Sequence, residues 1–144
     1  MLLKRGITGF FDKGVCPLDE NNYKVFKQAC YSFHMDFWNL NNVCDPDNTN
    51  YFYGHFTSNR QDLYILLNKY YPIAAFTNEL TMNKKTFIDI SENLYILGNY
   101  DIVRAEILNA AFTYSEHNLS KAELHQIKYW NPTSIGNIIF NEWD

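Results

Sequence analysis

The chain has 144 residues, of which 47% are hydrophobic and 17% are aromatic. This length and composition are typical of one globular domain that folds without disulfides or metal, and they exclude a disordered chain. The net charge of −4 argues against a nucleic-acid-binding protein, which would need a basic face, and it permits a basic protein partner.

The cysteines and the hydropathy pattern bear on where the protein works. Cys16, Cys30 and Cys44 are an odd number of cysteines with no close pair, which argues against a disulfide framework. We find no signal-peptide pattern and no apolar stretch near the ~18 residues that a membrane span needs. The sequence therefore predicts a cytoplasmic protein with reduced thiols and no membrane partner.

Tyrosine is unusually abundant, with 11 residues. Some of these rings could lie on the surface, where tyrosine is well suited to binding patches. A bias in base composition explains the number equally well, because asparagine, isoleucine and lysine are also plentiful.

The first third of the chain predicts an arm and a helix. Residues 1–11 read as a short strand or an extended arm that packs through Ile7, Phe10 and Phe11. A helix follows over about residues 20–34, with Asp19 as its cap. Its apolar side chains recur at spacings of three and four and form one stripe: Tyr23, Phe26, Cys30, Phe33 and Phe37.

Residues 39–50 are rich in asparagine and aspartate, which favour turns, so we predict a polar loop. Asp45 and Asp47 would make it a negative patch. The simpler interpretation, which we favour, is an ordinary solvated loop.

Residues 51–58 alternate in character, which predicts a strand with two different faces. The outward face would be polar and aromatic, with Tyr51, Tyr53, His55 and Thr57. The apolar face would hold Phe52, Gly54 and Phe56.

Further strands are predicted at residues 63–67, 70–77 and 87–90, and the short gaps between them favour antiparallel pairing. A short helix is expected at 91–98. Residues 100–110 fit a strand and a helix almost equally, and we choose a strand.

The end of the chain predicts helices that close the fold. A short helix is expected after Ser120. A terminal helix over residues 132–142 would begin at Asn131 as N-cap. Its apolar face would hold Ile135, Ile138, Ile139 and Trp143. The prediction is a single α+β domain over residues 1–144, with a central, mainly antiparallel sheet flanked by N-terminal and C-terminal helices.

A search for catalytic and metal-binding patterns is negative. The four histidines form no HExxH or HxH motif, and the cysteines form no CxxC pair. Cys30 and His34 could share a helix face, but a buried cysteine explains the pattern better. The pairs Asp45/Asp47 and Asp89/Glu92 read as solvated carboxylates. We predict no catalytic, cofactor or metal site, and therefore an interaction protein and not an enzyme.

Three stretches resemble small bacterial immunity proteins that are encoded beside polymorphic toxins, including those of contact-dependent growth inhibition. The first is KRGITGF at residues 4–10 and the second is YYPIAAF at residues 70–76. The third is IKYWNP at residues 127–132, continued by IGNIIFN at 135–141. These core and turn residues span most of the chain, and no functional residue carries over from them.

The resemblance implies a cytoplasmic protein that neutralises a cognate toxin, often a nuclease, by occluding its active site or a functional surface. A mildly acidic chain with exposed tyrosines would complement the basic site of a nuclease. We expect part of the toxin interface at Asp45, Asp47, Tyr51, Tyr53 and His55.

Two other classes stay open. One is a small enzyme, which a deep pocket holding His34 or His55 beside a cysteine or an aspartate would favour. The other is an adaptor domain that binds another cellular protein.

Overall fold

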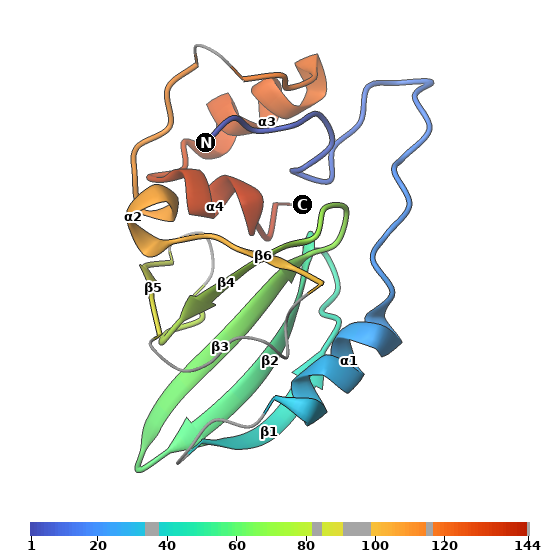
Figure 1. Ribbon diagram of the computed structural model, residues 1–144. Helices are drawn as coiled ribbons and strands as arrows, with labels where there is room; N and C mark the ends of the chain where they lie inside the picture. Colours follow the sequence, from blue (N-terminus) through green and yellow to red (C-terminus); the bar gives the residue numbers. More distant parts are fainter. Residues whose placement is uncertain (34–37, 82–84, 91–98, 115–116, 144) are drawn as a thin grey trace.

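The computed structural model describes residues 1–33, 38–81, 85–90, 99–114 and 117–143. It has an antiparallel sheet with helices from the N-terminal and C-terminal regions, so the predicted α+β class is confirmed (Figure 1). The helix predicted at 91–98 lies outside the described residues, as do His34 and Phe37.

The sheet is a meander with one added strand. Its antiparallel strands follow chain order: β1 (Asn39–Cys44), β2 (Tyr51–Ser58), β3 (Gln61–Asn68), β4 (Ile73–Thr77) and β5 (Phe87–Ile88). The short strand β6 (Asp101–Ile102) pairs with β4 in parallel. Asn59 and Arg60 form the β2–β3 turn with φ of 47° and 65°, the left-handed conformations that a two-residue hairpin needs.

The prediction of a polar loop over residues 39–50 was wrong in its first half. Residues Asn39–Cys44 form β1, and the turn occupies only the following six residues. Leu40 and Val43 pack against the core, and the pairing with β2 shifts register between Leu40 and Asn42. An edge strand with a bulge tolerates exposed asparagines, because its stability comes from backbone pairing and from one apolar side.

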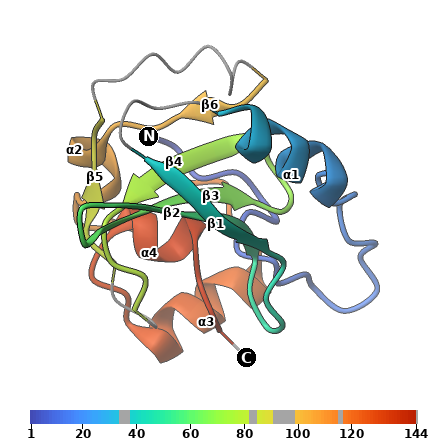
Figure 2. The same ribbon diagram turned by 90° about the horizontal axis from the view of Figure 1, so that it is seen from below.

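The two faces of the sheet are covered by different parts of the chain (Figure 2). On one side, the α1 face, helix α1 (Tyr23–Ser32) packs Phe26 and Cys30 onto Phe52, Phe56 and other apolar strand residues. Gly54 permits this approach, because a Cβ there would lie 2.9 Å from Cys30 Sγ. The other side, the α4 face, is covered at one end by α3 (Lys121–Trp130), α4 (Ile135–Ile139) and the N-terminal residues.

The N-terminal predictions were partly right. Residues 1–11 form a turn-rich arm without a strand, and Ile7 is buried in the core as expected. Helix α1 is shorter than the predicted range of 20–34. Its cap is Asn22, whose Oδ1 accepts a hydrogen bond from Val25 N, and not Asp19.

The C-terminal helix was also predicted with the wrong bounds. Ser120 and Glu123 form a capping box at the start of α3, and Asn131 ends that helix in a left-handed conformation with φ of 48°. Ser134, and not Asn131, caps α4. The expected apolar face is nevertheless buried: Ile135, Ile138, Ile139 and Trp143.

The strand predicted over residues 100–110 was wrong except for its first residues. After β6 the chain forms the short helix α2 (Ala105–Leu108). The backbone N–H of Ala105 donates a hydrogen bond to Asp89 Oδ1 at 2.9 Å. Leu108 is buried, which fits the helical alternative. Among the described residues, no helix has the length and apolar character to cross a bilayer.

Three buried asparagines fasten the chain ends to the sheet. The side-chain amides of Asn50 and Asn68 each donate to the carbonyls of Ile7 and Ile139, at 2.8 to 2.9 Å. The side-chain amide of Asn141 donates a hydrogen bond to Thr8 O, and its backbone N–H donates one to Asn50 Oδ1. These bonds satisfy buried polar groups of the backbone that no strand or helix pairs.

Glu123 fixes the N-terminal arm to α3. Its fully buried carboxylate accepts hydrogen bonds from Gly6 N, Thr8 N, Thr8 Oγ1 and Ser120 N at 2.7 to 3.1 Å. Four donors on one carboxylate compensate its removal from water. The N3 residue of the α3 capping box is thus also the anchor of the arm.

Candidate binding surface

Among the described residues, no helix lies over the β2–β3 hairpin end of the α4 face. The β2–β3 hairpin extends away from α3 and α4 (Figure 1), and on this part of the sheet several side chains are only partly buried. We call this surface the open face and define it by Tyr53, His55, Thr57, Asp62 and Tyr64.

The side chains of the open face hold one another in place. The His55 ring stacks on Tyr64 with centroids 4.5 Å apart, and its Nε2 lies 2.7 Å from Asp62 Oδ1. Tyr53 meets the edge of Tyr64 at 5.9 Å between centroids. These residues are cross-strand neighbours, because His55 pairs with Tyr64 and Thr57 pairs with Asp62. The result is an aromatic and polar surface whose side chains contact one another across the β2–β3 hairpin.

A hollow of about 500 Å³ adjoins the open face at Tyr53. We call it the tyrosine hollow. Its wall comes from the turn after β1, from β2, from the segment after β4, from the end of α3 and from the C-terminus. The residues that line it are Pro46, Asp47, Asn48, Thr49, Tyr51, Tyr53, Leu80, Thr81, Trp130 and Glu142.

A buried charge pair lies behind the hollow. The Lys85 side chain is fully buried and forms an ion pair with Glu142, and its Nζ lies 5.3 Å from the centroid of the Tyr51 ring. Tyr51 donates its hydroxyl hydrogen bond to Glu142 Oε1 at 2.5 Å. Among the described residues the Lys85 ammonium makes no hydrogen bond of good geometry, so this ion pair is what compensates its burial.

Burial is the largest cause of the pKa shifts of Lys85 and Tyr51. It lowers the pKa of Lys85, and the attraction of Glu142 opposes that shift. It raises the pKa of Tyr51, and the hydrogen bond to Glu142 raises it further. Both shifts favour the uncharged forms, as expected for groups removed from water.

The structure brings together most of the residues predicted for the interface, with one correction. Asp47 and Tyr53 line the hollow, and His55 lies on the open face. Asp45 is exposed and pairs with Lys69 at 2.9 Å. Tyr51 was expected to point outward but is only 3% exposed, because Phe140 and Glu142 from the far end of the chain cover it.

Sequence reasoning missed the partners that complete this surface. Trp130, Leu80 and Glu142 reach the hollow from three segments far from β2. Asp62 lies outside the strand predicted at residues 63–67, although it is the second residue of β3 and pairs with His55. The turn residues Asn59 and Arg60 were the available signal, because a two-residue hairpin places Asp62 opposite Thr57.

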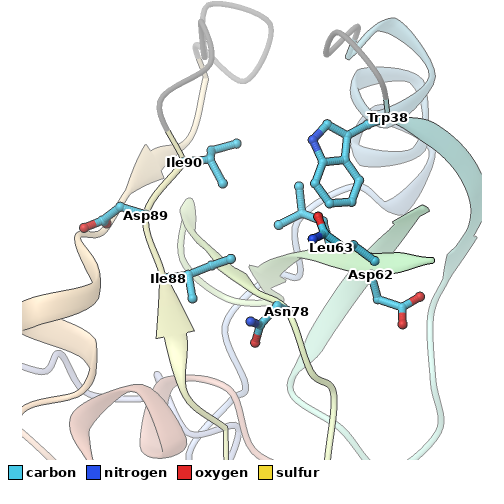
Figure 3. Close-up of a pocket in the computed structure, with 8 residues that line it drawn as sticks. Trp38, Asp62, Leu63, Asn78, Ile88, Asp89 and Ile90 are labelled. Carbon is cyan, nitrogen blue, oxygen red and sulfur yellow. The ribbon is translucent and has the colours of Figure 1, made fainter. Parts of the chain in front are cut away.

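A second hollow of about 500 Å³ lies at the other end of the sheet (Figure 3). Trp38, Leu63, Ile88 and Ile90 converge on it, whereas the carboxylates of Asp62 and Asp89 point away. Its floor is continuous with the core under α1. Gln61 and Asn78 also line this hollow, so its wall combines apolar side chains of the core under α1 with polar side chains.

The described residues offer little for catalysis. Among them, no group of three or more His, Cys, Asp or Glu side chains could hold a metal ion. Burial raises the pKa of the Cys30 thiol to about 12, which makes it a poor nucleophile. His55 pairs with Asp62, but neither hollow is lined by His55.

Comparisons with protein-family models, with curated proteins and with solved structures gave no match to this chain.

Proposed function

We propose that this protein is a bacterial immunity protein that binds a cognate toxin domain in the cytoplasm and neutralises it by occluding its active site or a functional surface. The toxin is proposed to be a nuclease. The proposal has its origin in the resemblance of residues 4–10, 70–76 and 127–141 to such proteins.

The observation that carries the proposal is the continuous surface formed by the open face and the tyrosine hollow. Its tyrosine and tryptophan rings are of the kinds that dominate protein interfaces. Its side chains are already ordered by stacking and by the His55–Asp62 pair, so little conformational entropy is lost on binding. Tyrosine and tryptophan also supply large contact areas at a low cost in conformational entropy, as in antibody binding surfaces.

The charge of this surface agrees with a basic partner. Asp47 is exposed at the rim of the hollow and has no ion-pair partner among the described residues. Asp45 is partly neutralised by Lys69, and Glu142 by Lys85. Asp47 is therefore the carboxylate best placed to meet a basic surface such as the phosphate site of a nuclease.

The test is co-expression of this chain with the toxin domain that the adjacent gene encodes. Growth of the bacteria would report neutralisation, and co-purification would report a complex. We expect rescued growth and a stable complex. Cell death without a complex would contradict the proposal.

Two charge reversals sharpen this test. Asp47→Lys should weaken the complex and reduce rescue, because a rim charge mainly sets association rate and salt dependence. Asp19→Lys is the matched control, since Asp19 is an exposed aspartate in the loop before α1. Equal loss in both variants would show a general charge effect and would exclude the hollow from the interface.

A further inference from the structure

Two of the three rings that line the tyrosine hollow have their polar groups hydrogen-bonded within the protein. Tyr51 donates to Glu142, and Trp130 Nε1 donates to Gln126 Oε1 at 3.0 Å. A guest in the hollow therefore meets aromatic carbon and the side chains of Leu80 and Pro46, together with the polar side chains of Asn48 and Thr49.

The same wall already holds one cation on its inner side. The Lys85 ammonium lies over the Tyr51 ring and pairs with Glu142. Electron-rich ring faces beside a carboxylate attract ammonium and guanidinium groups. The inner position is filled and its charge is balanced, so a second cation would lie on the solvent side, against Tyr53 and Trp130.

Asp47 supplies a charge partner on that outer side. It lines the hollow and is exposed, whereas the neighbouring Asp45 is held by Lys69. An arginine matches this arrangement better than a lysine, because its planar guanidinium stacks on rings, is weakly hydrated and pairs with carboxylates. Its apolar stem would pack on Leu80 and Pro46.

We infer that the tyrosine hollow binds an arginine side chain of a protein partner, with the guanidinium against the rings of Tyr53 and Trp130 and paired with Asp47. That the partner is a protein rests on the proposed function. The binding of a guanidinium side chain can be measured without any partner.

The experiment titrates the free protein with N-acetyl-arginine-N-methylamide and follows the indole N–H signals of its three tryptophans by NMR. Trp130→Phe assigns the Trp130 signal. The citrulline analogue is the matched probe, because it has nearly the same shape and no charge. The phenylalanine analogue tests whether the hollow prefers an apolar guest.

We expect the arginine probe to shift the Trp130 signal saturably and the citrulline probe to shift it much less at equal concentration. Asp47→Asn should weaken binding of the arginine probe about threefold to fivefold, as for a partly exposed charge pair. Asp19→Asn should leave it unchanged. Equal shifts from citrulline, preference for phenylalanine, or no response at Trp130 would each overturn the inference.

The result is separable from the proposed function. Arginine binding together with failure to neutralise the toxin would leave the ligand class of the hollow intact and remove the immunity proposal. Rescue of growth without arginine binding would support the immunity proposal and overturn the inferred ligand of the hollow. Both outcomes can be read because the probe titration needs only this chain.

Discussion

The two faces of the sheet are packed by different physical means. On the α1 face the contacts are between apolar side chains, with Phe26 and Phe33 of the α1 segment against Phe52, Phe56 and Phe76 of the strands. On the α4 face the described core also contains four buried asparagines, Glu123 and the Lys85–Glu142 pair.

This difference decides what each face can tolerate. An apolar core accepts changes that keep volume and character. A buried polar network needs every donor and acceptor, because a group left unpaired retains its full desolvation cost. The asparagines and Glu123 also fix where the chain ends lie, since their partners are single backbone groups of the arm and of the segment after α4.

The largest effect is expected for Glu123→Leu. Gly6 N, Thr8 N, Thr8 Oγ1 and Ser120 N would lose their acceptor. We expect a loss of about 3–5 kcal/mol in the free energy of unfolding, measured by urea denaturation.

Two variants control the Glu123 experiment. Glu123→Gln keeps part of the acceptor capacity and should lose less. Glu106→Gln removes an exposed carboxylate that pairs with exposed Arg104, and it should change stability by less than about 0.5 kcal/mol. A loss below about 1 kcal/mol for Glu123→Leu would show that the arm does not depend on this anchor.

Adjacent residues of β3 allow the two faces to be compared directly. Asn68 faces α4, donates to two carbonyls and accepts from Tyr70 N and Tyr71 N. Leu67 faces α1 and is fully buried. We expect Asn68→Leu to cost about 2–4 kcal/mol and Leu67→Met less than about 1.5 kcal/mol. Thermal and urea unfolding measure both losses. If the two substitutions lowered the free energy of unfolding equally, the distinction between the faces would be wrong.

The sequence predicts most of the apolar packing of the two faces but not the polar network of the α4 face, and the reason is physical. Periodicity reveals the apolar stripe of α1 and the alternation of Phe52, Gly54 and Phe56. It cannot reveal that Asn50, Asn68 and Asn141 are buried, because asparagine favours exposed turns when it has no distant partner. The same preference of asparagine for turns led to the wrong prediction of a loop at residues 39–44.

The candidate surface was predicted in part for the same reason. Alternation along β2 correctly put Tyr53 and His55 on one face, but it does not show how much of that face is covered. Tyr51 is buried because Phe140 and Glu142 return to it over about ninety residues. Contacts at that separation are set by the packing of the whole fold and leave no local pattern.

A smaller effect is expected from pH on the Lys85–Glu142 pair. Burial lowers the pKa of Lys85 in the folded state, so above that pKa the unfolded chain binds more protons. Stability should therefore rise with pH until the unfolded lysine also loses its proton near about 10.4. Because burial raises the pKa of Tyr51, ionisation of the unfolded tyrosine near about 10 opposes the rise there.

Urea unfolding between pH 7 and 9.5 checks this prediction, with Lys85→Met as the comparison. The wild-type free energy of unfolding should rise relative to that of the variant as the pH increases. Parallel pH profiles would show that Lys85 keeps an ordinary affinity for its proton in the folded state.

The smallest effect is expected on the open face, where His55 pairs with Asp62. The Asp62 side chain is 50% exposed and that of His55 is 20% exposed, so water screens their interaction. A double-mutant cycle with His55→Gln and Asp62→Asn should give a coupling of about 0.2–1 kcal/mol, far below the cost at Asn68. A coupling above about 2 kcal/mol would mean that the pair is part of the buried network. A small coupling free energy means that substitutions on the open face cost little stability. The residues of the open face can therefore change to fit a partner, whereas those of the covered part of the α4 face cannot.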